Sequence, residues 1–100
     1  ERINGKDHIM KYQFLEFFKE HIKVEISDLK HDDDIFGGQK VIVYFTNTLT
    51  HAQGTAVLPT YEWLSKGSLS RSDIDFCNKL LRSNNSLIFE EAREGELPVA

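Results

Sequence analysis

A polar segment that ends in two glycines separates two strand-like patterns in this chain. Residues 23–29 and residues 40–48 have the alternating or continuous apolar character of β-strands. Between them lies the segment His31–Gly38, with three consecutive aspartates, an Ile-Phe pair and then the glycines. Because glycine adopts positive φ without a steric penalty, such a segment readily closes a hairpin. The sequence therefore predicts two strands joined by an acidic loop.

The residues before this hairpin predict a helix. Apolar side chains recur at three- and four-residue spacing over roughly residues 8–21, with charged side chains mostly on the other side. Asp7 is the expected N-cap of this helix. We expect its apolar stripe to bury three phenylalanines against the sheet: Phe14, Phe17 and Phe18.

Three strands are predicted in the middle of the chain. The first two are those of the hairpin, and the segment 41–45 is apolar on both faces, which is typical of a central strand. Residues 55–58 form a third short strand, which Pro59 ends because proline lacks the N–H that a ladder needs.

Helices are predicted for the rest of the chain. Residues 61–66 have the flanks of a short helical turn, and a second helix should run from about residue 70 to residue 83. Residues 86–94 favour a helix over a strand, because most of them are good helix formers. The predicted fold class is α+β: an N-terminal helix, a three-stranded antiparallel meander, and two or three C-terminal helices packed on one face.

Composition indicates one compact domain over residues 1–100, with residues 1–6 and 96–100 frayed or part of a linker. The chain is 40% hydrophobic and 28% charged, as in ordinary globular domains. Its single cysteine, Cys77, lies in an apolar stripe and is expected to be a buried core thiol. A lone cysteine favours a reducing compartment, and no stretch approaches the ~20 apolar residues of a membrane span. We therefore expect a cytoplasmic protein without membrane association.

Charge argues against nucleic-acid binding. The net charge is −4, whereas affinity for nucleic acid depends on neutralising phosphates. The helix predicted from residue 70 also begins with Asp73 and Asp75, which occupy the end where a phosphate would bind. A nucleic-acid accessory domain is therefore kept only as an alternative.

The acidic loop is the main candidate for chemistry. Carboxylates and an imidazole could hold a divalent cation, so a small metal-dependent hydrolase is a second alternative. Its residues would be His31, Asp32, Asp33 and Asp34. A calcium loop, however, spaces its ligands at alternate positions and ends with a glutamate, and that spacing is absent here. We expect a solvated turn, and the sequence predicts no catalytic residue, no metal site and no cofactor.

The end of the chain carries a resemblance without a functional implication. The closing run Phe89–Glu96 resembles the end of small bacterial domains of unknown function, some of them encoded near toxin–antitoxin systems. It covers under a tenth of the chain, and its residues are common helix formers. It identifies no family and implies no activity.

Apolar residues in polar surroundings favour a binding function over an enzymatic one. Ile35 and Phe36 follow three aspartates in a segment that should face solvent. Tyr61 and Trp63 are of the amphipathic kind that is common at recognition surfaces. We hypothesise that these four residues form a carboxylate-rimmed surface for a protein partner or for self-association. The predicted function is a small acidic binding or regulatory domain, whose partner and oligomeric state the sequence leaves open, as it does whether the chain is a fragment of a longer protein.

Overall fold

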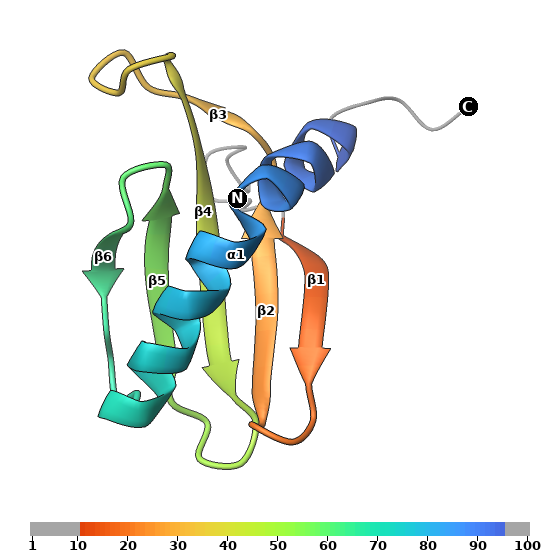
Figure 1. The fold of residues 1–100 in the computed structure, drawn as a ribbon, viewed down its shortest axis with the longest axis vertical. Helices are drawn as coiled ribbons and strands as arrows, with labels where there is room; N and C mark the ends of the chain where they lie inside the picture. The colour runs from red at the N-terminus through yellow and green to blue at the C-terminus, as the bar shows by residue number, and fades with distance from the viewer. Residues whose placement is uncertain (1–10, 96–100) are drawn as a thin grey trace, which may run out of the picture.

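The computed structural model describes residues 11–95 of this chain as an antiparallel sheet with a long helix across one face (Figure 1). Its elements are β1 (Lys11–Phe17), β2 (Ile22–Ser27), β3 (Lys30–His31), β4 (Gln39–Asn47), β5 (Gln53–Leu58), β6 (Glu62–Ser65) and α1 (Arg71–Gly95). The strands lie in the order β1-β2-β4-β5-β6, and the short β3 pairs with the start of β4. The structure thus combines a sheet and a helix, but not in the predicted arrangement. Within residues 11–95 no helix is both long and apolar enough to cross a membrane.

The predicted N-terminal helix is wrong, because residues 11–17 form β1 at the edge of the sheet. Pairing of β1 with β2 changes register between Gln13 and Leu15, which marks a β-bulge. The bulge allows Phe14 and Phe17, three residues apart, both to pack against the core. The buried side chains of β1 therefore have the three-residue spacing that is typical of a helix. Phe18 was expected to be buried, but its side chain is 77% exposed. The predicted cap Asp7 and the predicted terminal linkers, 1–6 and 96–100, lie outside the described residues.

The second half of the chain also differs from the prediction. Residues 62–65 are not a helical turn but β6, which pairs with β5 and completes a six-stranded sheet in place of a three-stranded meander. The helices predicted over residues 70–83 and 86–94 are one continuous helix, α1. The described chain therefore has a single helix where two or three C-terminal helices were expected.

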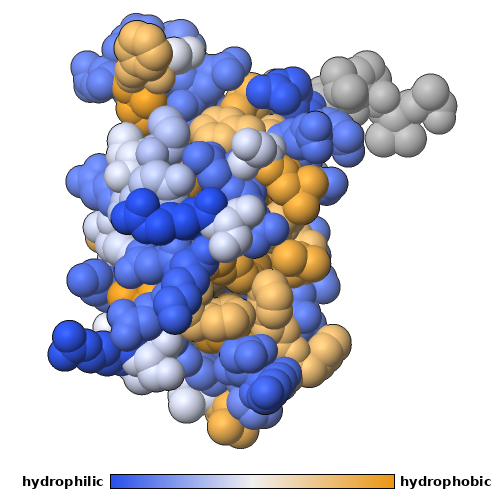
Figure 2. Space-filling view, in the orientation of Figure 1, coloured by the Kyte–Doolittle hydropathy of each residue, from blue (hydrophilic) through white to orange (hydrophobic). Residues whose placement is uncertain are grey.

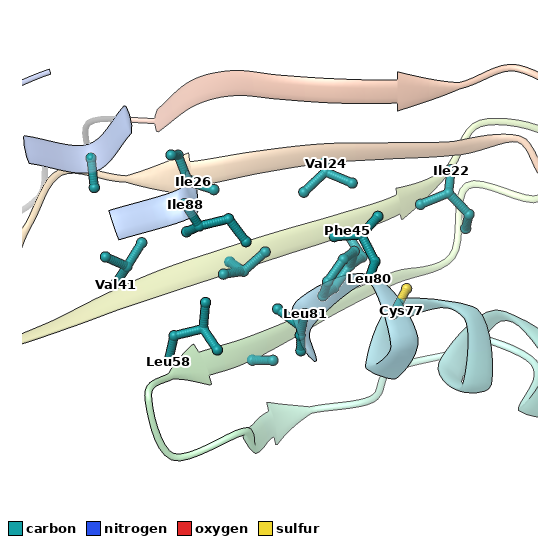
Figure 3. Packing of buried hydrophobic residues seen from close by; sticks show 13 residues of the cluster. Ile22, Val24, Ile26, Val41, Phe45, Leu58, Cys77, Leu80, Leu81 and Ile88 are labelled. Carbon is teal, nitrogen blue, oxygen red and sulfur yellow. The ribbon is translucent and has the colours of Figure 1, made fainter. Parts of the chain in front are cut away.

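The core lies between α1 and the three middle strands (Figure 3). Alternate residues of β4 are buried, and β4 occupies the centre of the sheet as predicted for residues 41–45. Val43 and Phe45 are fully buried beneath Leu81 and Ile88 of the helix. Cys77 is buried as predicted, and burial raises the pKa of its thiol to about 12. The thiol therefore stays protonated at neutral pH and serves as a core side chain.

A reciprocal cap places the start of α1. The backbone N–H of Asp73 donates to the Ser70 hydroxyl at 3.0 Å, and the Ser70 N–H donates to the Asp73 carboxylate at 3.4 Å. The same carboxylate accepts a hydrogen bond from the Asn47 side chain at 3.1 Å. The cap therefore ties the first turn of the helix to the end of β4.

Candidate functional site

The acidic loop stands at the tip of a hairpin arm that projects beyond the sheet (Figure 1). The arm begins where β2 ends. At that point the Ser27 hydroxyl replaces a backbone carbonyl as the hydrogen-bond acceptor for β4. It accepts a hydrogen bond from the Ile42 N–H at 3.0 Å and donates one to the Asp28 carbonyl at 2.7 Å. After this break, Lys30 pairs with Lys40 in a shifted register, and β3 carries the chain outward.

Backbone hydrogen bonds give the loop a defined conformation. The N–H of Asp32 donates to the Gly38 carbonyl at 2.9 Å, and the N–H of Gly38 donates to the Ile35 carbonyl at 2.7 Å. The N–H of Ile35 in turn donates to the Asp32 carbonyl at 3.2 Å. Gly37 and Gly38 both have positive φ, +92° and +74°, which is why this turn needs glycine at both positions.

Side chains brace the same loop. One carboxylate oxygen of Asp32 lies 2.9 Å from the Lys40 ammonium, and the other accepts a hydrogen bond from the Asp34 N–H at 2.9 Å. The hydrogen bond from Lys40 and then that from Asp34 hold the pKa of Asp32 below its usual value of 3.8. His31 and Asp33 also pair at the surface, with 2.7 Å between Nε2 and Oδ1. Side-chain hydrogen bonds and ion pairs therefore brace both sides of the loop.

This arrangement offers little to a metal ion. Among residues 11–95 no three His, Cys, Asp or Glu side chains are grouped as ligands. Asp32 is already engaged by Lys40, Asp33 is paired with His31, and Asp33 and Asp34 are both exposed. His51 lies in the β4–β5 turn, at the other end of β4, whose eight residue steps of about 3.3 Å span roughly 26 Å. A metal-dependent hydrolase would need an assembled set of metal ligands, and residues 11–95 contain none.

A nucleic-acid interface would need basic side chains that converge on one face of the molecule. Lys66 and Arg71 do line one hollow, of about 470 Å³, at the start of α1. Asp75 lines the same hollow, and the neighbouring Asp73 already caps the helix end with its carboxylate. The hollow therefore carries charges of both signs. The N-terminus of α1 is already capped by side chains of this chain.

The structure separates the four residues of the hypothesised binding surface into two groups. Phe36 is fully exposed at the loop tip, and Ile35 beside it is half-buried. Figure 2 shows this tip as an isolated apolar spot above polar surroundings. Tyr61 and Trp63 instead belong to the β5–β6 turn and β6, and both pack against the core.

Tyr61 and Trp63 hold β6 to the helix. The indole N–H of Trp63 donates to the Asn78 side chain at 3.0 Å, and its ring lies 5.5 Å from that of Phe45. The Tyr61 hydroxyl accepts a hydrogen bond from Asn85 at 3.1 Å, and the Arg82 guanidinium lies 4.6 Å above its ring. Their polar atoms are thus already used within the fold, and only the loop residues of the hypothesised set are free to project.

Sequence reasoning missed a second apolar surface, at the opposite end of the sheet. Phe18 was assigned to the core, yet it lies exposed in the β1–β2 turn, directly after Phe17, which forms a groove with Phe76. The signal was present in the three polar residues that follow Phe18, since a run of this kind is typical of a turn.

The Asp32–Lys40 contact can be tested by titration. We expect the pKa of Asp32, measured by NMR, to lie below 3.8 and to rise in Lys40→Gln. Because the folded-state pKa is lowered, the contact stabilises the loop above the unfolded-state pKa and is lost as pH falls through the folded-state value. Lys30→Gln, which removes a similar contact to Asp28, is the matched control and should leave the pKa of Asp32 nearly unchanged. An Asp32 that titrates alike in all three proteins would contradict this account.

Comparisons with protein-family models, with curated proteins and with solved structures give no match to this chain. The feature that stands out is the acidic loop, which hydrogen bonds hold in one conformation and which exposes the Phe36 ring to solvent.

Proposed function

We propose that this protein is a small binding domain that recognises a protein partner by inserting Phe36 into an apolar pocket of that partner. The observation that carries the proposal is the full exposure of Phe36 at the tip of a braced hairpin arm. Loops present functional side chains in this way because the scaffold holds the loop without needing it in the core. Ile35, next to Phe36 and half-buried, extends the apolar surface of the tip.

The bracing supports binding because it reduces the entropy lost on association. Full burial of a phenylalanine side chain contributes about 1.5–3 kcal/mol, but a mobile loop would lose part of that gain when it becomes ordered. In this loop the hydrogen bonds of Asp32 and Gly38 fix the backbone before any partner arrives. The transfer energy of Phe36 is therefore largely available for binding.

Charge indicates the kind of partner. Asp33 and Asp34 are both exposed and lie immediately before the Ile-Phe pair. A pocket with lysine or arginine on its rim would complement these carboxylates, and such complementarity raises the rate and specificity of association. The partner we propose is therefore a protein with an apolar pocket bordered by basic side chains.

Phe36→Ser tests the proposal. Its free energy of unfolding should stay within about 0.5 kcal/mol of wild type, because the ring has no packing role in the described fold. Affinity for a partner captured with the wild-type chain, then purified and titrated by calorimetry, should fall roughly ten- to a hundredfold.

Leu49→Ser is the matched control, since Leu49 is an apolar side chain, 67% exposed, in the turn at the other end of β4. It should leave the affinity for the partner unchanged. If Phe36→Ser binds as tightly as wild type, or if it unfolds several kcal/mol more easily, Phe36 is not the recognition residue.

A further inference from the structure

An apolar groove lies between the end of β1 and the first half of α1. Phe17 and Phe76 meet edge to face in it, with ring centroids 5.2 Å apart and planes at 80°. The groove has a volume of about 220 Å³, and Leu80 and Lys79 also line it. The groove is open to solvent, and its volume exceeds that of an enclosed apolar cavity of about 150 Å³ that binds benzene.

One exposed aromatic residue lies in the turn that directly follows this groove in the chain. Phe18 follows Phe17 directly, but it lies in the β1–β2 turn and is 77% exposed. Figure 2 shows apolar side chains along the side of the molecule formed by β1 and α1. Leu15 and Leu87, 38% and 43% exposed, add to the apolar residues of these two elements.

We propose that this side joins two copies of the chain about a twofold axis, with Phe18 of each copy seated in the Phe17–Phe76–Leu80 groove of the other. Phe18 directly follows Phe17 of the groove, so each copy can offer both a ring and a groove to the other. A twofold contact uses both features twice and closes, as in most homodimers.

Charge supports a second copy as the occupant. Glu20 lies in the same turn as Phe18, and Lys79 lines the groove that would receive that turn. The twofold arrangement therefore brings a carboxylate of each copy toward an ammonium of the other. Lys19 also lies in the turn and is exposed, so the charged rim does not consist of one sign.

Side chains rather than backbone should make this contact. β1 lies at the edge of the sheet, where a strand of another chain could in principle add to it. The bulge between Gln13 and Leu15, however, interrupts the regular edge of β1. The groove and Phe18 lie past this bulge, toward the end of the strand.

The dimer is independent of the proposed function, because the two surfaces lie at opposite ends of the sheet (Figure 1). If both hold, each dimer presents two Phe36 loops, and a partner with two pockets would gain avidity. That consequence alone rests on the proposed function.

Sedimentation equilibrium of the full chain over a range of concentrations tests the dimer. We expect wild type to form a concentration-dependent dimer below about 1 mM, and Phe18→Ser to weaken it about a hundredfold or more, because each dimer loses two buried rings. Phe18→Ser should unfold like wild type, since its ring is exposed in one copy. Phe36→Ser should dimerise like wild type. A wild-type chain that stays monomeric at about 1 mM, or a dimer that survives Phe18→Ser, would overturn the proposal.

A charge exchange tests the geometry separately. Glu20→Lys alone and Lys79→Glu alone should each weaken the dimer, because each brings like charges together across the twofold axis. The double variant Glu20→Lys/Lys79→Glu should regain most of the lost affinity. If the two effects simply add, Glu20 and Lys79 do not face each other and the twofold arrangement is wrong.

Discussion

Phe45→Ala is expected to lose about 3–5 kcal/mol of unfolding free energy, the usual range for removing a buried phenylalanine. Phe45 lies in β4 at the centre of the sheet and has no exposed surface. Its ring packs against Trp63, so truncation leaves a cavity under β6 as well as under the helix. Since domains of this size are stable by about 5–15 kcal/mol, a denaturant titration should show a large fall in the midpoint.

Phe18→Ala is the control for this variant. The same truncation at an exposed site should change the free energy of unfolding by no more than about 0.5 kcal/mol. The titration is done at a low protein concentration, so that any association through Phe18 does not contribute. Equal losses at the two positions would mean that residues 11–21 pack as a helix against the sheet and that the described fold is wrong.

Gly67→Ala is expected to lose about 2–5 kcal/mol of unfolding free energy, for two reasons that add. Gly67 has a φ of +53°, a conformation that side chains with a Cβ rarely adopt. A Cβ at this position would also overlap the carbonyl oxygen of Gln53, at the start of β5. Because the obstacle is backbone, relief would require β5 or the segment after β6 to move. Thermal or denaturant unfolding of the purified variant gives the loss directly.

Gly37→Ala separates these two causes. Gly37 also has positive φ, +92°, but a Cβ there would meet no atom within 4 Å. This variant should therefore show only the backbone strain, roughly 1–2 kcal/mol. If Gly67→Ala is no more destabilised than Gly37→Ala, the close approach of Gln53 contributes nothing.

Local patterns predicted the middle of the sheet and the start of the helix. Residues 23–29, 40–48 and 55–58 correspond to β2, β4 and β5, with bounds that differ by a few residues. The strand at 41–45 was placed at the centre because it is apolar on both faces, although its second face, with Ile42 and Tyr44, is only half-buried. The helix was expected from about residue 70, and its cap by Ser70 and Asp73 accounts for the start at Arg71.

Long-range pairing explains the elements that local patterns missed. The bulge in β1 depends on where β2 pairs with it, and without that knowledge the spacing of Phe14 and Phe17 is indistinguishable from a helix. Residues 62–65 have no strong strand pattern of their own, and they form β6 because β5 lies beside them. Asn85 falls between the two predicted helices, but its side chain bonds to Tyr61 and the helix continues through it.

The candidate sites, too, divide into features that local patterns predicted and features that depend on long-range contacts. The glycines and aspartates of residues 31–38 identified a loop from local chemistry, and the structure puts Phe36 at its tip. Phe18 was assigned to the core because a hydrophobic side chain in a periodic pattern is normally buried. Its exposure depends on the end of β1 and on the path of α1, which are not encoded near it.

The sequence by itself determined the loop at residues 31–38, where three of the strands run and where α1 begins. These features depend on the period of side chains and on caps and turns, which act over a few residues. Only the tertiary structure decided which side chains share a face around the bulge, that β6 joins the sheet, that Phe17 and Phe76 form a groove, and that Phe18 is exposed. Those features depend on contacts between segments far apart in the chain, and a local pattern carries no information about the partner that completes it.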